Sequence, residues 1–309
     1  MIHVIDVQSR ATIQDLGRLG LRRFGISQCG AMDKLALRAG NILLGNAEDA
    51  PAIEVPLGGI TLQFQQDMNF CVTGAFYEMT LDDKPVFAYW RYQARAGQVL
   101  KMIRAKIGMY GYLCVQGGFL LPKELNSCST DLRAQIGGME GRGLQAGDQL
   151  QTVNDPILRS EIGIAPIPLK HTIHALPSSE YQAFKRKSQY YWWRGKWTLQ
   201  SSSDRMGYRF QGQKLELKQP LEMLSHAIQF GSVQVPPSGQ PIILMADAQT
   251  TGGYPKIANV IDADLGALAQ VRLGSTIQFE AINLEQAAKL RRKNEIYLDQ
   301  IRRIVDEKN

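Results

Sequence analysis

The 309-residue chain is 44% hydrophobic and 21% charged, a composition that fits a globular protein larger than one usual domain and excludes a disordered one. No apolar run approaches the length of a membrane span, and the N-terminus lacks the zones of a secretory signal, so we expect a cytoplasmic protein with no membrane partner. The net charge of +6 raises the question of a nucleic-acid partner, which the arrangement of the cations argues against.

The first predicted element is a helix that begins at Lys34. Asp33 is a good N-cap for it, and Gly45 is the expected terminator. Most of the following sequence reads as short strands separated by Gly, Asp or Pro, with a hairpin turn at 82–85. The fold class is therefore mainly β with a few helices. The expected strands cover residues 52–57, 60–64, 69–73, 78–81, 99–103, 110–115 and 149–153.

A crossing between two lobes is predicted at 155–168, which holds three prolines among mixed residues. We therefore expect domains at 1–160 and 161–309. The second should end in a helix over 283–309, with Asn283 and Gln286 in capping-box positions. Its apolar stripe consists of Leu284, Ala288, Leu298, Ile301 and Val305. This helix could cover a sheet edge or dock a partner subunit.

Aromatic and basic side chains interleave between residues 181 and 197. Bases could stack on such aromatics beside cations. The same pattern suits a short helix that packs its aromatic side inward and leaves its lysines in water. We favour the helix and expect no nucleic-acid partner.

Metal-ligand patterns are weak in this sequence. The four cysteines include no Cys-x-x-Cys pair, and His171 and His174 lie in what reads as a strand entry, which would put their rings on opposite faces. We expect no metal site on these side chains. Cys71 and Cys114 are expected to be buried small hydrophobes.

The most informative segment is 245–256, because it ends an apolar strand (241–246) in a dense group of hydrogen-bonding side chains. Adjacent glycines let a ligand approach the main chain, and the neighbouring polar side chains offer donors and acceptors. A tight turn alone would need the glycines and Tyr254-Pro255 but not the polar side chains around them. We therefore predict a ligand site here.

This segment occurs with four others, at 30–33, 129–134, 204–209 and 234–241. Together they resemble the biotin-dependent carboxyltransferase domain family, which includes the carboxyltransferase portion of urea carboxylase and the C subunit of bacterial 5-oxoprolinase. The resemblance runs from Val7 through 14–18 to 268–270. The segments 26–30 and 126–130 look like the 5-oxoprolinase branch of the family, with Cys29 and Cys128 where many relatives have Ser and Arg.

The resemblance implies two cyclophilin-like β-barrel lobes. It implies a hydrolase subunit that helps convert 5-oxo-L-proline to L-glutamate with ATP, in a hetero-oligomer with the B and A subunits of 5-oxoprolinase. Mg²⁺ is a further candidate cofactor, and the chain carries no Met-Lys-Met motif for covalent biotin. Because no Walker-type motif occurs either, we expect the chain to be inactive alone.

Opening a lactam requires stabilisation of a phosphoryl group and of an oxyanion, and the family motifs supply candidates for both. Arg205 and Arg18 are the cationic donors, and Asp247 or Asp33 could orient a proton or Mg²⁺. Cys29 could be a nucleophile or a small polar liner of the site. The full set of candidate catalytic residues is Asp247, Gln249, Thr250, Thr251 and Arg205. The candidate substrate-binding residues are Gly252, Gly253, Tyr254, Tyr208, Ser27, Cys29, Asp33 and Arg18.

Two other functions remain open from the sequence. The chain could be a carboxyltransferase that acts on an amide substrate with carboxybiotin supplied in trans. It could instead be a regulatory protein that binds a kinase inhibitor, as some relatives are thought to do.

Overall fold

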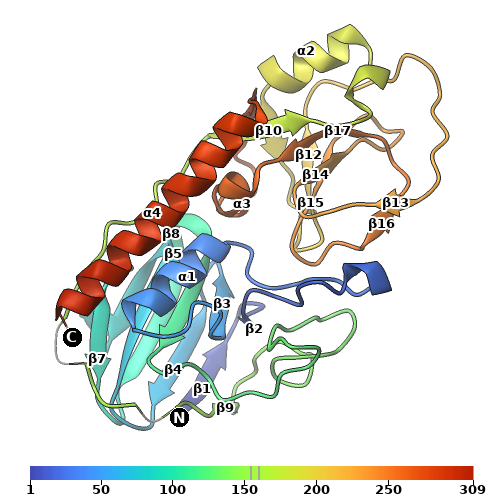
Figure 1. Ribbon diagram of the computed structural model, residues 1–309. Coiled ribbons are helices and arrows are strands. Elements are labelled where there is room, and N and C mark those ends of the chain that lie inside the picture. Colours follow the sequence, from blue (N-terminus) through green and yellow to red (C-terminus); the bar gives the residue numbers. More distant parts are fainter. Residues whose placement is uncertain (154, 159–160, 309) are drawn as a thin grey trace. The chain divides into compact units, whose positions relative to one another are not determined.

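The computed structural model describes residues 1–153, 155–158 and 161–308, which form two compact units (Figure 1). Unit one comprises Met1–Arg18, Cys29–Pro168 and Glu295–Asn309, and unit two comprises Leu19–Gln28 and Leu169–Asn294. Both units are discontinuous in sequence, whereas the expected domains 1–160 and 161–309 are continuous. Residue 160 and residue 309, which bound those expected domains, lie outside the described residues.

Unit one is built on an antiparallel sheet of nine strands in which β2-β3-β8-β4-β1-β9 are successive neighbours and β5 joins through β8. The sheet curls into a half-barrel, and the mainly β fold class is confirmed. The strands are β1 (Ile2–Val7), β2 (Thr12–Gln14), β3 (Ala52–Pro56), β4 (Ile60–Phe64), β5 (Met68–Leu81), β6 (Lys84–Pro85), β7 (Arg91–Ala94), β8 (Val99–Val115) and β9 (Gln149–Leu150).

The two longest strands correct the sequence prediction, which divided each of them in two. β5 pairs with β8 along most of its length, and the register shifts near Gly74, Phe76 and Glu78. Such bulges allow one strand to bend and continue where the local sequence reads as a break. The predicted hairpin turn joins β5 to β6, where Asp82 and Asp83 both have positive φ, as a tight two-residue hairpin turn requires.

The predicted first helix is confirmed as α1 (Lys34–Leu43). Asp33 is its N-cap, and the Asp33 carboxylate accepts a hydrogen bond from the Ala36 N–H at 3.1 Å. Gly45 follows the helix with a φ of 72°. Its inward side packs on β5, where the Thr73 hydroxyl donates to the Ala36 carbonyl.

Unit two contains a closed barrel of seven strands in the order β10-β17-β14-β15-β12-β11-β18. A separate short ribbon pairs β13 (His226–Ala227) with β16 (Thr251–Gly252). The barrel strands are β10 (Thr172–Pro177), β11 (Trp197–Leu199), β12 (Gly207–Gln211), β14 (Ser232–Gln234), β15 (Ile242–Leu244), β17 (Lys256–Val260) and β18 (Thr276–Ala281). The remaining elements of this unit are the 3₁₀ turns η1 (Arg22–Phe24) and η2 (Tyr181–Ala183) and the helices α2 (Arg186–Arg194) and α3 (Asp262–Ala269).

The aromatic segment forms α2, as the preferred interpretation predicted. Trp192 is fully buried and stacks on Phe279 of β18, with ring centroids 4.2 Å apart. The lysines of this segment, Lys185, Lys187 and Lys196, are exposed. The aromatic side chains that point inward therefore belong to the core of unit two.

The C-terminal helix α4 (Leu284–Lys308) begins with the predicted capping box. The Asn283 N–H donates to Gln286 Oε1 and the Gln286 N–H donates to Asn283 Oδ1, both at 2.9 Å. Its apolar stripe is only half buried: Leu298, Ile301 and Val305 are in the core, whereas Leu284 is 76% exposed. Within the described part of the chain, no helix has both the length and the apolar character needed to cross a bilayer.

Of the two histidines in question, His174 is a strand residue and His171 precedes the strand. His174 lies in β10, where its Nδ1 is 2.6 Å from the buried Asp264 carboxylate. Among the described residues, no group of three His, Cys, Asp or Glu side chains is gathered as metal ligands would be. Cys71 and Cys114 are fully buried, and burial raises the pKa of the Cys71 thiol, as expected for a small hydrophobe.

Candidate functional site

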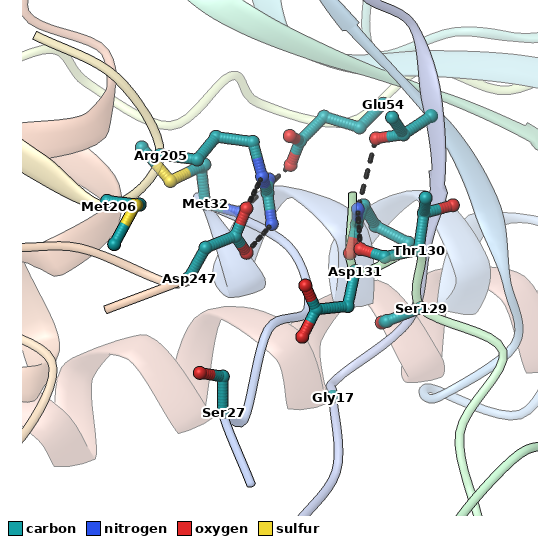
Figure 2. Close-up of polar contacts among 12 residues, drawn as sticks. Gly17, Ser27, Met32, Glu54, Ser129, Thr130, Asp131, Arg205, Met206 and Asp247 are labelled. Atoms are coloured by element: carbon teal, nitrogen blue, oxygen red, sulfur yellow. Dashed lines mark hydrogen bonds and ion pairs between the residues drawn. The ribbon is translucent and has the colours of Figure 1, made fainter. Parts of the chain in front are cut away.

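The Arg205–Asp247 pair links two of the family motifs in unit two. Arg205 Nε and Nη2 donate to the two carboxylate oxygens of Asp247 at 2.8 and 2.7 Å (Figure 2). The Asp247 N–H also donates to the Arg205 carbonyl at 2.9 Å. The side chains are only 14% and 15% exposed, so this bidentate pair holds the two loops in a fixed register.

Local turn chemistry explains why Arg205 is presented in this way. Asp204 does not pair with Arg205; its Oδ1 accepts the N–H groups of Met206 and Gly207 at 2.9 and 3.1 Å. An aspartate that binds the backbone two and three residues ahead of it makes a tight turn. The turn ends where Gly207 starts β12, so Arg205 lies on the loop just before the barrel.

The segment 19–28 adds a third part to this loop cluster. Ser27 Oγ is 3.4 Å from the Ala248 carbonyl, and Arg22 Nη2 donates to the carbonyls of Gln249 and Ile228 at 2.9 and 2.7 Å. Sequence reasoning did not single out Arg22. The available signal was its position just before the matched segment 26–30, and the structure places it in the 3₁₀ turn η1.

The glycine pair continues from this cluster into the short ribbon. Neither Gly252 nor Gly253 is among the residues with positive φ, so neither is required for a left-handed backbone. A Cβ on Gly252 would lie 2.6 Å from Gln234 Nε2, whereas one on Gly253 would have its nearest contact at 3.4 Å, with the Met223 carbonyl. Close approach to Gln234 is therefore the physical reason for the first glycine.

Gly253, Tyr254 and Pro255 line a pocket of about 510 Å³ together with 235–237 of another family motif. Residues 214–217, Pro220 and Leu221 also line this pocket. Tyr254 is 47% exposed. The pocket is large enough for a small organic ligand and is bounded by a backbone turn and rigid prolines.

A buried polar cluster beside the glycine pair was missed by the sequence analysis. Lys256 Nζ forms an ion pair with Glu180 Oε2 at 2.9 Å and contacts His226 Nε2. Burial opposes ionisation of Glu180, but hydrogen bonds from Ser179 and Lys256 outweigh it and lower its pKa. Gln234 Nε2 is buried without a hydrogen-bond partner among the described residues. Lys256 closes the motif 245–256, so the signal was in the sequence.

The other predicted residues of the 247–254 loop differ in exposure. Gln249 and Thr251 are exposed and Thr250 is half-buried. The Thr250 carbonyl accepts the Ile228 N–H at 3.1 Å, which ties the loop to the β13 side of the ribbon. Tyr208 is fully buried and its hydroxyl donates to the Ala269 carbonyl at 2.8 Å, which gives it a role in the barrel core.

Unit one contains a second convergence of motifs, centred on Asp15. Asp15 Oδ1 accepts hydrogen bonds from the hydroxyls of Ser127 and Ser129 at 2.6 and 2.5 Å and from the Gly17 N–H at 2.7 Å. Asp15 Oδ2 accepts the Cys128 N–H at 2.6 Å. Asp15 is 5% exposed, and these donors fix the segments 14–18 and 127–130 against each other.

The segment 29–33 joins the same part of unit one. Gly30 has a φ of 86°, and a Cβ there would lie 2.8 Å from the Gly17 nitrogen, so only glycine fits. Cys29 is buried and also has positive φ, at 54°. This buried position favours the liner over the nucleophile among the two predicted roles.

Asp33 connects this segment to the sheet. Its N–H donates to the Tyr112 hydroxyl at 2.7 Å, and that hydroxyl donates to Glu54 Oε2 at 2.9 Å. The Met32 N–H also donates to Glu54 Oε2 at 2.9 Å. Burial, followed by the nearby Glu54 and Asp33 charges, raises the pKa of Tyr112 well above its usual value, so the phenol stays protonated as a donor.

The candidate residues thus fall into two groups. Unit two brings together Arg205, Asp247, Ser27 and the loop 249–254, and it holds Tyr208 in its core. Unit one holds Arg18, Cys29 and Asp33 in the motif cluster around Asp15.

Comparison with known proteins identifies a family and two relatives that share one name. Residues 24–281 match the family described as "Carboxyltransferase domain, subdomain A and B". The chain is 90% identical to a Haemophilus influenzae protein named as the C subunit of 5-oxoprolinase, with 100% of both chains covered. It is 47% identical to the Escherichia coli protein of the same name, with 97% of both covered.

More distant relatives are parts of larger proteins. The chain is 28% identical to a segment of the Lachancea kluyveri "Urea amidolyase", covering 93% of this chain and 17% of that protein. The crystal structure of the K. lactis urea amidolyase superposes with a TM-score of 0.90 at 26% identity, over 97% of this chain and 20% of that one.

Proposed function

The chain belongs to the carboxyltransferase domain family, and from that membership we propose that it is the C subunit of an ATP-dependent 5-oxoprolinase that converts 5-oxo-L-proline to L-glutamate. The observation that carries the proposal is the 90% identity, over the full length of both chains, to a protein named as that subunit. The carboxyltransferase alternative rests on relatives below 30% identity and is not better supported.

ATP, when bound, supplies a phosphoryl group that makes the lactam carbonyl carbon easier to attack. The residues that fit an anion of this kind are cationic donors without a carboxylate partner. Arg205 gives two of its N–H groups to Asp247, so its charge is already balanced in this structure. The role of Arg205 in this proposal is therefore to position the 247–254 loop.

We propose that the lactam binds beside the 247–254 loop of unit two. Thr251 is exposed and Thr250 half-buried on this loop, beside the pocket lined by Gly253 and Tyr254. Hydroxyl and backbone donors on a fixed loop can stabilise an oxyanion without reorganising during the reaction. We propose that Thr250 and Thr251 supply such donors to the substrate carbonyl.

The carboxylates proposed for Mg²⁺ do not fit that role as they are arranged. Asp247 is bound by Arg205 through both oxygens, and Asp33 caps α1. A metal ligand at either position would have to give up one of these contacts. The proposed reaction therefore assigns no step to a metal held by this chain.

The proposal includes the A and B subunits of 5-oxoprolinase as partners in a hetero-oligomer, because the relatives with the highest identity quoted above are named as one subunit of an enzyme. We also place the complex in the cytoplasm. The four cysteines of this chain are buried and form no disulfide among the described residues, as is usual in a reducing compartment.

The test is reconstitution of the purified chain with the A and B subunits, followed by measurement of glutamate and phosphate with 5-oxo-L-proline and ATP. We expect both products to form in proportion, and only when 5-oxo-L-proline is present. Carboxylation of an amide substrate by added carboxybiotin, with no lactam opening, would contradict the proposal and support the carboxyltransferase alternative.

A further inference from the structure

Arg18 is a buried cation with no ion-pair partner in the described part of the chain. The side chain has no exposed surface, and its Nε and Nη1 atoms have no hydrogen-bond partner among the described residues. Nη2 donates to the Ser129 carbonyl at 2.8 Å. A buried guanidinium with unused N–H groups is costly unless an anion completes it.

The neighbouring carboxylate does not supply that anion. Asp15 uses its oxygens on the Ser127 and Ser129 hydroxyls and on the N–H groups of Gly17 and Cys128. These donors are neutral, so the Asp15 charge is stabilised without Arg18. Asp15 and Arg18 are three positions apart in the sequence, and each is held by its own hydrogen bonds.

The surroundings of Arg18 add a hydroxyl and two glycines. Thr130 Oγ1 is also buried without a partner among the described residues. Gly137 and Gly138 have φ values of 72° and 57°. A Cβ on Gly137 would lie 2.6 Å from Arg18 Nη2, and one on Gly138 would lie 2.0 Å from Thr130 Oγ1. The backbone is therefore packed against these two polar groups where any side chain would block them.

We propose that Arg18, with Thr130 beside the glycine pair, binds an oxyanion of a ligand, a carboxylate or a phosphoryl group. Arg205 cannot serve in the same way without breaking its pair with Asp247. The choice of 5-oxoproline carboxylate or ATP phosphate as the source rests on the proposed function. The anion chemistry itself rests on the buried guanidinium and its unused N–H groups.

The experiment measures anion binding by calorimetry on the full-length chain and on the complex with the A and B subunits. The probes are 5-oxo-L-proline, its neutral carboxamide, inorganic phosphate and ATP. We expect the carboxamide to bind more weakly than 5-oxo-L-proline if the carboxylate is the source. Phosphate and ATP binding that depends on Arg18 would identify the phosphoryl group instead.

The variants are Arg18→Met, which removes the charge, and Arg18→Lys, which keeps a charge but lacks the planar N–H groups. Arg133→Met is the matched control, because Arg133 is exposed on the segment 129–134 that carries Thr130. We expect Arg18→Met to weaken binding of the anion by at least about 30-fold and Arg18→Lys by less, with Arg133→Met unchanged.

Thermal melting separates this role from a structural one. Without ligand, Arg18→Met should melt no lower than the wild type, because an unbalanced buried charge is removed; a structural arginine would give a clear loss. If Arg18→Met fails to fold, two measurements still test the proposal. They are anion binding to the Arg18→Lys variant and carboxamide binding to the wild type. Anion binding that is unchanged in Arg18→Lys and equal for acid and carboxamide, with no Arg18-dependent phosphate binding, would overturn the proposal.

The two proposals can fail independently. If the complex opens 5-oxo-L-proline but its anion binding does not change when Arg18 is substituted, only the inference about Arg18 is overturned. A complex that binds phosphate through Arg18 but never opens the lactam would overturn the proposed function and leave the Arg18 site in place.

Discussion

At the scale of single residues, the contacts of the motif side chains separate positions that the sequence treats alike. Arg18 and Arg205 both belong to family motifs and were both predicted to face phosphoryl charge. Arg205 is paired with Asp247 through two hydrogen bonds, whereas Arg18 has buried N–H groups without a partner among the described residues. Only three-dimensional contacts could assign them different tasks.

The Arg205–Asp247 pair leads to a prediction about turnover. Arg205→Ala should lower 5-oxoproline-dependent ATP turnover of the complex, because the loop that carries Thr250 and Thr251 loses its anchor, and the loss should stay below the roughly 10²–10³ found when a direct oxyanion donor is removed. Asp247→Ala should act through the same loop, so the double variant should be no slower than the worse single variant. Steady-state kinetics with thermal melting checks this. If the loss of turnover in the double variant equals the product of the two single-variant losses, the two side chains act separately.

The glycine pair gives a second prediction with a built-in control. Gly252→Ala places a Cβ 2.6 Å from buried Gln234 Nε2, whereas the nearest atom to a Cβ on Gly253 is at 3.4 Å. We expect Gly252→Ala to reduce turnover several-fold and Gly253→Ala to change it little. Gly253→Val, a larger side chain at the pocket wall, should abolish activity before stability is lost. Equal rates for all three variants would reduce this segment to an ordinary loop.

At the scale of elements, local sequence signals correctly predicted the helix caps and the hairpin turn. The N-cap at Asp33, the Asn283–Gln286 capping box and the hairpin at 82–85 were all found as expected, because each depends on a few adjacent residues. The division of β5 and β8 into shorter strands was wrong, because bulges are set by pairing with a distant partner strand.

The candidate site shows the same limit. The motif run 245–256 includes three residues that line the pocket, but the glycines do not have positive φ, and the close approach of Gly252 to Gln234 could not be read from composition. The partners of those residues could not be read: Glu180 reaches Lys256 across 76 positions, and Arg205 reaches Asp247 across 42. The order of the barrel strands brings these distant residues into contact, and that order cannot be read from a single sequence.

An ion-pair network in unit one predicts a pH dependence. Arg38 of α1 contacts Glu48 at 2.5 Å and Glu295 of α4 at 2.8 Å, and Arg302 of α4 also pairs with Glu48. Burial opposes ionisation of Glu48, but hydrogen bonds from Arg38 and Arg302 outweigh it and hold its pKa below the usual 4.5. A depressed carboxyl pKa contributes stability above the unfolded value, and this is lost as the pH falls through the folded value.

The free energy of unfolding should therefore decline as the pH falls below 4.5, and Glu48→Gln should remove part of that decline. Because the side chains are partly exposed, we expect Glu48→Gln to cost about 1 kcal/mol near pH 7. Urea unfolding at pH 7 and pH 4 provides the measurement. A variant whose stability falls with pH as steeply as that of the wild type would show that Glu48 is not part of the cause.

At the scale of the whole molecule, the chain has the features of one part of a larger enzyme. It carries no Walker-type nucleotide motif, and the H. influenzae and E. coli relatives are named as one subunit of an enzyme. Its family members in urea amidolyase are segments of much longer chains. The names of the two relatives and the length of the urea amidolyase chains both support a division of labour between this chain and its partners.

The most direct test of the central claim is an omission assay that counts glutamate formed from 5-oxo-L-proline and ATP. Three samples are compared: the A and B subunits with this chain, the A and B subunits without it, and this chain alone. We predict sustained glutamate formation only in the first. Equal glutamate formation with and without this chain, or 5-oxoproline-dependent ATP hydrolysis by the chain alone, would contradict its role as an obligatory part of a 5-oxoprolinase.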